Sequence, residues 1–453
     1  MSEILGSIWW LIVSLGVLVT FHEFGHYWVA RRCGVRVLRF SVGFGKPLWS
    51  RRGRDGTQYV VAAIPLGGYV KMLDEREGEV AAADLGQAFN RKSVWQRMAI
   101  VVAGPVANLL LCVALLWGMF VIGRPDFAPV VGLTDGIAAQ SGLKGGDTVL
   151  AVGERATPTW SEVQLALLPA ALDHSDVAVQ VRTAAGARQT RQLRLSRLPT
   201  EFDQRRAIDA IGLTPRHLLV PPVVGRVVPD SPAWGVLAEG DRITAVDGKP
   251  VASWGDIGPL VQRLGARGGI AMIEVERGGD RLALEVQPHS QAVEAAPDRW
   301  VLGIGSTRQQ APAMDAVLRL GPVAAVPAAF RETRHQAAQL FAMIGRAFTG
   351  RVSVQNTVAG PITIARATNA YASHGAAWFL SILAMLSLSL GILNLLPIPI
   401  LDGGHLLYYL IELVKGSPVS ERVMAAGQYI GLGLIAALMG LAFYNDIANL
   451  LVR

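Results

Sequence analysis

Four long apolar runs constrain this fold more than any other feature of the sequence. They cover residues 4–30, 98–122, 376–396 and 424–443, and Glu23 is the only residue in them with a formal charge. A run of about 20 apolar residues can cross a bilayer as a helix, in which every backbone polar group finds a partner within the segment. Hydrophobic residues make up 51% of the 453 positions, which is high for a soluble protein. We therefore expect four transmembrane helices.

The first apolar run carries the pattern His22-Glu23-Phe-Gly-His26. On a helix the two histidines lie one turn apart on one face, so both can bind one Zn²⁺ while Glu23 stands beside them as a general base. Ionisable groups at membrane depth are costly and are rarely kept without a metal, a partner or a pathway. At about 1.5 Å per residue, His22 lies roughly 12 Å inside the end marked by Arg31. The alternative is a pair of interfacial histidines without a metal.

The charge distribution predicts the orientation of the chain. Residues 31–54 contain eight basic and no acidic side chains, which places this end of the first span in the cytoplasm. Both termini and residues 124–306 are then periplasmic. The same bias accounts for the net charge of +7, and no zinc-finger, aromatic-ladder or basic-helix pattern indicates nucleic acid as a partner. The two cysteines, Cys33 and Cys112, lie far apart and predict no disulfide framework.

Residues 35–72 have the pattern of a β hairpin. The stretches 35–49 and 58–72 flank Asp55-Gly56, a common hairpin turn pair, and several glycines would bend the strands. One interpretation is an ordinary cytoplasmic flap. The other is a membrane-associated hairpin whose edge strand pairs with substrate backbone beside the active site.

An internal repeat marks the middle of the chain. Pro129-Val-Val-Gly recurs as Pro222-Val-Val-Gly, and Gly146-Asp to Trp160 aligns with Gly240-Asp to Trp254. An offset near 94 residues indicates two domains of about that size. The order of strand, Gly-Asp turn, short strands and helix resembles a PDZ domain, so we expect the leading strand and the helix to line a peptide groove in which a peptide adds to the edge of that strand. The alternative is a pair of spacers with empty grooves.

Residues 328–350 have helical apolar spacing with arginines elsewhere around the wheel, which indicates a helix on the membrane surface. Packing against the soluble domains is also compatible with this pattern. The apolar positions are Ala337, Leu340, Phe341, Ile344 and Phe348. Gly360-Pro361 breaks the chain before the third span.

The third span ends in Asn394-Leu-Leu-Pro-Ile-Pro-Ile-Leu-Asp402-Gly-Gly-His405. Two prolines and two glycines prevent a regular helix, so irregular backbone is expected where the chain lines a cavity. The number of membrane crossings brings Asp402 to the same side as the two histidines. A carboxylate would complete a three-residue zinc site and leave the fourth position for water. His405 is the rival third ligand.

Taken together, these motifs resemble the site-2 protease family of intramembrane zinc metalloproteases, and its bacterial sigma-E-regulating branch with tandem PDZ domains. The resemblance covers nearly the whole chain and includes Gly104-Pro105 and Asn108 in the second span. It implies zinc bound by His22, His26 and Asp402, with Glu23 as base and Asn394 holding substrate. It also implies a membrane-reentrant hairpin and an inner-membrane location with the active site toward the cytoplasm.

The resemblance further implies single-span membrane substrates: an anti-sigma factor trimmed by another protease, and remnant signal peptides. The PDZ-like pair would bind the new C-terminus or exclude bulky substrates. A non-catalytic membrane scaffold that binds peptides through these domains is the competing class, and a membrane-anchored protease acting on soluble proteins is a second alternative. Three convergent ligands favour an open, catalytic metal site.

The expected architecture is a polytopic α-helical membrane protein in contact with lipids, with four transmembrane helices, a membrane-associated β hairpin and two periplasmic PDZ-like α+β domains. The expected segments are 1–32, 33–93 and 94–123 for the first helix, the hairpin and the second helix; 124–214 and 215–310 for the two domains; 311–372 for the surface region; and 373–410 and 411–453 for the last two helices.

Overall fold

The computed structural model describes residues 2–199, 202, 206–293, 296–307, 312–349 and 359–451. It folds into two compact units, one comprising Met1–Arg124 with Arg319–Arg453 and the other Pro125–Leu318. We call them unit 1 and unit 2. Parts of the predicted surface region, residues 311 and 350–358, lie outside the described residues.

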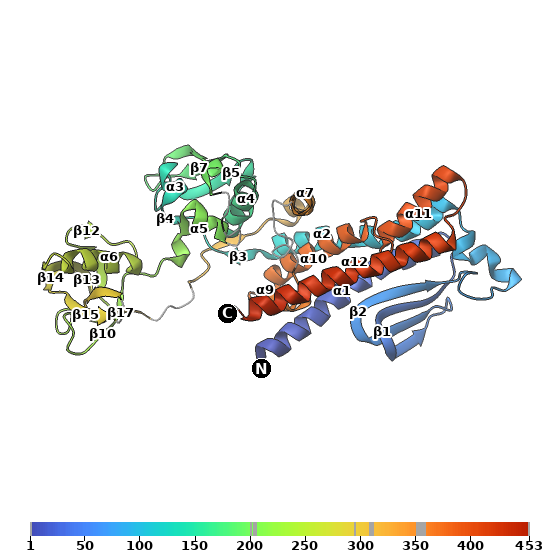
Figure 1. Ribbon diagram of the computed structural model, residues 1–453, viewed down its shortest axis with the longest axis horizontal. Coiled ribbons are helices and arrows are strands. Elements are labelled where there is room, and N and C mark those ends of the chain that lie inside the picture. Colours follow the sequence, from blue (N-terminus) through green and yellow to red (C-terminus); the bar gives the residue numbers. More distant parts are fainter. Residues whose placement is uncertain are drawn as a thin grey trace. The chain divides into compact units, whose positions relative to one another are not determined.

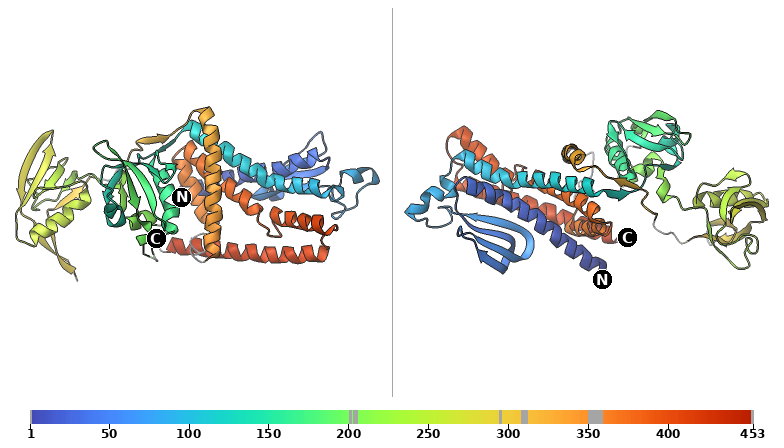
Figure 2. Two further views of the ribbon diagram at one scale, coloured as in Figure 1. Left: turned by 90° about the horizontal axis from the view of Figure 1, so that it is seen from above. Right: turned by 180° about the vertical axis from the view of Figure 1, so that it is seen from behind.

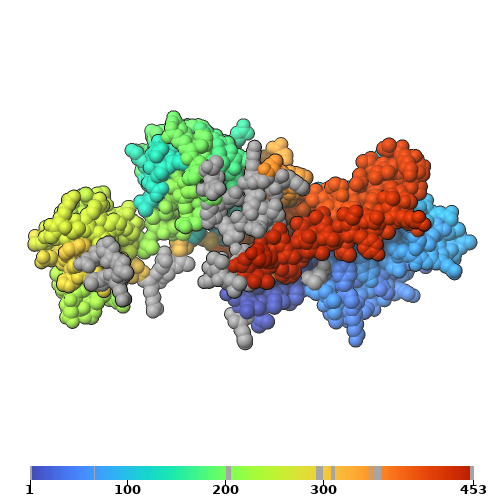
Figure 3. All heavy atoms as spheres, viewed as in Figure 1, coloured from blue at the N-terminus to red at the C-terminus, as the bar shows by residue number. Residues whose placement is uncertain are grey.

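Four helices of unit 1 are long and apolar enough to cross a membrane, as the sequence predicted. Figures 1 and 2 show them running in roughly the same direction. They are α1 (Ser2–Arg32), α2 (Val94–Ile122), α10 (Ala376–Asn394) and α12 (Glu421–Leu451). Large apolar side chains on their outer faces are exposed, among them Trp9, Leu110 and Ile430. Along the face drawn in Figure 3, α12 lies at the surface of unit 1. An apolar exterior of this kind suits a lipid environment.

Three further helices complete unit 1: α7 (Pro322–Phe348), α9 (Pro361–Ser373) and α11 (Asp402–Lys415). The left view of Figure 2 shows α7 crossing the long helices at a steep angle. Trp117 of α2 donates a hydrogen bond from Nε1 to the Pro322 carbonyl oxygen at 2.9 Å, which fixes the start of α7. The amphipathic helix predicted over residues 328–350 is thus observed as α7, which begins earlier, at Pro322, and ends at Phe348. The side chain of Phe348 lies outside the described residues.

Local sequence signals account for several helix ends. Ser93 and Gln96 form a reciprocal capping box at the start of α2. Pro361 occupies the first turn of α9, where its missing N–H costs nothing. The predicted break after the third span is confirmed, because α10 ends at Asn394 and α11 begins at Asp402.

The predicted hairpin consists of two long, bent strands, β1 (Val37–Arg52) and β2 (Gln58–Met72). Residues 37–42 of β1 pair with both halves of β2, and residues 47–52 pair with the first half of β2. The sheet thus has the order 68–72, 37–42, 58–62, 47–52, and residues 68–72 form one of its edges. Gly43 and Gly45 have φ values of 92° and 85°, a conformation that favours glycine, at the bend of β1.

Unit 2 repeats one order of elements twice, with a separate apolar core in each repeat. In both, a leading strand is followed by two short strands, a helix and a β hairpin, and a late strand returns to pair with the leading one. The first module contains β4 (Val131–Thr134), α3 (Gly136–Gln140), β5 (Thr148–Val152), β6 (Arg155–Ala156), α4 (Trp160–Leu172), β7 (Val177–Arg182), β8 (Arg188–Leu193), α5 (Ala207–Ile211) and β9 (Leu213–Pro215).

The second module adds a hairpin before its last strand. It contains β10 (Val224–Val227), β11 (Arg242–Val246), β12 (Lys249–Pro250), α6 (Trp254–Gly265), β13 (Ala271–Arg277), β14 (Asp280–Val286), β15 (His289–Val293), β16 (Ala296–Val301) and β17 (Ile304–Ser306). Short strands β3 (Arg124–Asp126) and β18 (Ala316–Leu318), where the chain enters and leaves the unit, pair with each other.

The expectation that each leading strand offers its own edge to a peptide is wrong. The strand β10 pairs with β17, and Val223, the residue before β10, bridges to Arg242 of β11. In the first module, β4 pairs with β9, and Val130, the residue before β4, bridges to Thr148 of β5. A cavity of about 1290 Å³ in the second module instead lies between α6 and the segment that leads into β17. The pairing partner is about 80 residues away in sequence, so no local pattern reveals it.

Candidate active site

Three side chains predicted as metal ligands converge in unit 1. His22 and His26 lie on α1, and Asp402 is the first residue of α11. Their ligand atoms lie within 4.8 Å of one another. The two Nε2 atoms are 3.3 Å apart, and they lie 3.2 and 3.5 Å from Oδ2 of Asp402. Ligands bound at about 2.0–2.1 Å to a tetrahedral Zn²⁺ are separated by about 3.3 Å, so the spacing fits this ion.

The polar environment of Asp402 also fits a cation. Its Oδ2 is buried and receives no hydrogen bond from any group in the described part of the chain. A buried carboxylate oxygen without a donor is costly unless a positive charge compensates it. Two imidazoles and one carboxylate leave one position of a four-coordinate zinc ion open, which is the arrangement of catalytic rather than structural zinc sites.

Each metal-site histidine is oriented by a group on α2. Nδ1 of His26 donates a hydrogen bond to the Ile100 carbonyl oxygen at 2.8 Å, which leaves Nε2 as the ligand atom. Nδ1 of His22 lies 3.2 Å from Nδ2 of the Asn108 amide, whose Oδ1 is buried without a partner among the described residues. A half-turn of this amide places Oδ1 against Nδ1–H, which satisfies both groups and frees Nε2 for a metal.

Asn108 is itself held in place by α10. The hydroxyl of Ser387 donates a hydrogen bond to the Asn108 carbonyl oxygen at 2.8 Å, and both residues are fully buried. Gly391, one turn further along α10, allows this close approach, since a Cβ there would lie 3.1 Å from the Pro105 carbonyl oxygen. The helix α10 therefore holds α2 in place at Asn108, the residue that orients His22.

Glycine at position 104 makes room for both imidazoles. A Cβ at this position would lie 2.3 Å from Nε2 of His26 and 2.9 Å from Cε1 of His22. Gly25 of α1 has the reciprocal role, because its Cβ would lie 2.2 Å from the Ala103 carbonyl oxygen. The two helices therefore approach closely enough for the histidines to lie against the α2 backbone.

Glu23 lies beside the ligands and is 9% exposed. Residues 68–72, the edge of the hairpin sheet, run alongside it: a Cβ on Gly68 would lie 2.9 Å from Cγ of Glu23. The hairpin edge and the candidate base therefore face the same space. Of the two interpretations of residues 35–72, this contact favours the edge strand beside the active site.

A cavity of about 670 Å³ opens on the ligand group. Its walls include Glu23, Tyr69 of β2, Tyr408 of α11 and Met424 of α12. His405, the rival ligand, lines the cavity but does not belong to the converging group. Asn394, the predicted substrate-binding residue, is half-buried at the end of α10 and is not among the lining residues.

Sequence reasoning missed the α2 groups that orient the histidines. A backbone carbonyl such as that of Ile100 leaves no trace in the sequence. Asn108 did leave one, because it is the only amide in a charge-free apolar run, but helix packing explained it equally well.

Comparisons with known proteins agree with this geometry. Residues 10–438 match the family described as peptidase family M50. A Xylella fastidiosa (strain Temecula1) protein whose name includes "zinc metalloprotease" is 53% identical over 447 residues, covering 99% of this chain and 100% of the relative. The regulator of sigma-E protease RseP is 42% identical in Escherichia coli (strain K12), covering 97% of this chain and 98% of the relative. The Salmonella typhimurium (strain 14028s) protein of that name is 40% identical, with 99% and 100% covered.

Proposed function

Since this chain belongs to peptidase family M50, the site-2 protease family, and is therefore a zinc metalloendopeptidase of the inner membrane, we propose that it cleaves peptide bonds within the transmembrane segments of single-span proteins. The observation that carries this proposal is the position of the ligand group. His22 and His26 lie on α1, one of the four helices long and apolar enough to span a membrane. A substrate would therefore meet the metal at membrane depth.

In the proposed reaction, His22, His26 and Asp402 hold the zinc ion and Glu23 is the general base. Zinc supplies Lewis acidity, which polarises a carbonyl group and acidifies water. The carboxylate of Glu23 accepts the proton of the attacking water and later delivers it to the leaving amine. The Ile100 carbonyl and the Asn108 amide keep both imidazoles in the ligand-forming tautomer.

The hairpin edge is the proposed binding site for the substrate backbone. A transmembrane helix hides its carbonyl groups in internal hydrogen bonds, so it must unwind before attack. Residues 68–72 offer a strand edge beside Glu23 to which an unwound segment can add. Asn394, at the end of α10, would hold the backbone of a longer bound segment.

We propose an anti-sigma factor as the physiological substrate, with remnant signal peptides as further substrates. The relatives named regulators of sigma-E protease support this assignment. The two modules of unit 2 would be PDZ-like domains that bind the trimmed C-terminus or exclude bulky substrates. The basic residues that follow α1 favour a cytoplasmic active site, with both termini and unit 2 in the periplasm.

The test compares the wild-type protein with Glu23→Gln. Both are purified in detergent, their zinc content is measured, and each is incubated with single-span substrates and with casein. The proposal predicts one zinc ion per chain in both, cleavage of the single-span substrates by the wild type alone, and no cleavage of casein. Cleavage by Glu23→Gln would contradict the assignment of Glu23 as the general base. Absence of cleavage by the zinc-loaded wild type would favour a non-catalytic, peptide-binding scaffold.

A further inference from the structure

One turn of α2 touches both halves of the metal site. The histidines come from α1 and the carboxylate from α11, which lie more than 370 residues apart in the sequence. On α2, the Ile100 carbonyl oxygen accepts the hydrogen bond from His26, and Arg97, three residues earlier, binds Glu412 of α11. A single helical turn is therefore in contact with the elements that carry all three ligands.

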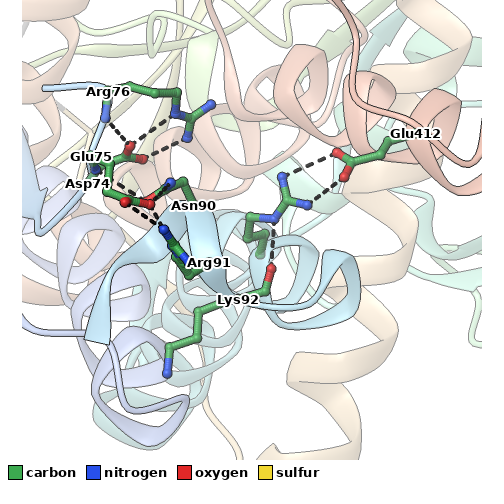
Figure 4. Close-up of polar contacts among 8 residues, drawn as sticks. Asp74, Glu75, Arg76, Asn90, Arg91, Lys92 and Glu412 are labelled. Carbon is green, nitrogen blue, oxygen red and sulfur yellow. Dashed lines mark hydrogen bonds and ion pairs between the residues drawn. The ribbon is translucent and has the colours of Figure 1, made fainter. Parts of the chain in front are cut away.

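The contact between Arg97 and Glu412 is bidentate. Nη2 lies 2.7 Å from Oε1 and Nη1 lies 3.2 Å from Oε2. Nε donates to the Lys92 carbonyl oxygen at 3.1 Å, and the guanidinium carbon lies 4.9 Å from the ring centroid of Tyr409. Figure 4 labels Lys92 and Glu412, the partners in these hydrogen bonds. The planar guanidinium is thus fixed from three directions, which gives the pair a defined geometry.

Burial of both partners distinguishes this pair from the pair of Arg91 and Glu75, which Figure 4 also draws. The side chains of Arg97 and Glu412 are 10% and 14% exposed, whereas those of Arg91 and Glu75 are 54% and 28% exposed. An exposed pair contributes little, because water solvates both charges when it breaks. Breaking a largely buried pair leaves a charge without compensation, so the helices are held at the separation that the pair requires.

The position of Glu412 on α11 links this contact to the metal. Asp402 is the first residue of α11 and Glu412 is the eleventh, so about 15 Å of continuous helix connects them. A helix of this length moves as a rigid element. A slide or rotation of α11 against α2 at Glu412 therefore moves the Asp402 carboxylate away from the histidines.

We infer that Arg97 and Glu412 are positioning residues for the zinc site: their ion pair fixes α11 against α2 so that Asp402 reaches the ligand atoms of His22 and His26. This inference rests on the ligand set of the proposed function. The pair touches neither the metal nor the substrate, and its effect on the reaction passes through Asp402 alone.

The test measures zinc affinity by competition with a chelator on the detergent-purified full chain. In Arg97→Met and Glu412→Gln, we expect zinc affinity to fall about 10–100-fold, the range seen when groups behind metal ligands are removed. The double reversal Arg97→Glu with Glu412→Arg should recover most of the affinity that each single reversal loses. Arg91→Met and Glu75→Gln, which break the exposed pair, are matched controls and should change the affinity less than twofold.

A variant with two apolar side chains separates positioning from simple stability. Arg97→Met combined with Glu412→Leu removes both charges and keeps helix packing, so its zinc-free thermal midpoint should stay near that of the wild type. We still expect weaker zinc binding and a lower kcat with little change in KM once zinc is saturating. Wild-type zinc affinity in this double variant, or equal effects of breaking the buried and exposed pairs, would overturn the inference.

These readouts do not depend on the identity of the substrate. If the wild type binds zinc but cleaves no single-span protein, the proposed function fails while the affinity comparison still tests the role of the ion pair. If cleavage occurs and the affinities of all variants agree, the function stands and the positioning role is refuted.

Discussion

Replacing Gly104 by alanine is the most direct perturbation of the metal site that changes none of the proposed ligand residues. The added Cβ would lie 2.3 Å from Nε2 and 2.5 Å from Cε1 of His26, whereas side-chain Cβ atoms essentially never approach other heavy atoms within 3.0 Å. The imidazole or the α2 backbone must therefore move by about 0.7 Å. The imidazole of His22 is also crowded, at 2.9 Å from the new atom.

A displacement of this size exceeds what a zinc site tolerates. Metal–ligand distances in functional sites stay within about 0.2 Å of their usual values, so one ligand bond would be lost or strongly distorted. We expect zinc affinity to fall at least about tenfold, equivalent to about 1.4 kcal/mol. The assay is chelator competition on the purified protein, with zinc content by elemental analysis.

Gly16→Ala on α1 is the matched control for this substitution. Among the described residues, no heavy atom outside the neighbouring backbone of α1 lies within 4 Å of a Cβ built at position 16, and alanine favours the helix over glycine. Its zinc affinity should equal that of the wild type, with a thermal midpoint that is equal or higher. Wild-type zinc affinity in Gly104→Ala would refute the conclusion that the imidazoles pack against this position.

Three further predictions concern other parts of the chain. Gly68→Val should keep zinc but lower kcat about 100-fold, because the new side chain displaces Glu23 from the hairpin edge; unchanged kcat would contradict this. Asn108→Ala should weaken zinc binding about tenfold, because the imidazole of His22 loses the amide that orients it. An unchanged zinc affinity would exclude this orienting role of Asn108. In unit 2, burial raises the pKa of Asp241, but the hydrogen bonds from Arg277 and from the Ala238 backbone N–H, together with the charge of Arg277, outweigh burial, so the net pKa is below the usual value. Since the folded pKa is depressed, this stabilisation is complete above about pH 4 and is lost as pH falls below it; thermal unfolding between pH 7 and pH 3 should show this loss, and Asp241→Asn should remove that part of the pH dependence.

The four long apolar helices of unit 1 were predictable because their signals are local. Apolar runs long enough to cross a membrane leave few alternatives, and the prolines and glycines after Asn394 predicted the break between α10 and α11. The convergence of the three candidate ligands was also predictable, since helical spacing places His22 and His26 on one face and the number of membrane crossings brings Asp402 to the same side. The structure brings these three residues together at distances that suit zinc.

Contacts between distant segments that carry no recognisable motif were not predictable. Arg97 and Glu412 are separated by 315 positions, and nothing in either neighbourhood indicates the other. The pairing of β10 with β17 likewise joins strands far apart in the sequence, which is why the groove of the second module was expected at the wrong edge. The glycines at 68 and 104 were visible in the sequence, but only the fold shows which side chains lie against them.

The central claim is that two distant parts of the chain, α1 and the start of α11, together hold one catalytic zinc ion. The most direct test is zinc content combined with X-ray absorption at the zinc edge for the wild type and for Asp402→Ala. We predict one zinc ion per wild-type chain, with two imidazoles and two oxygen ligands at about 2.0–2.1 Å, and loss of tight binding in the variant. Stoichiometric zinc with an unchanged spectrum in Asp402→Ala would contradict the account.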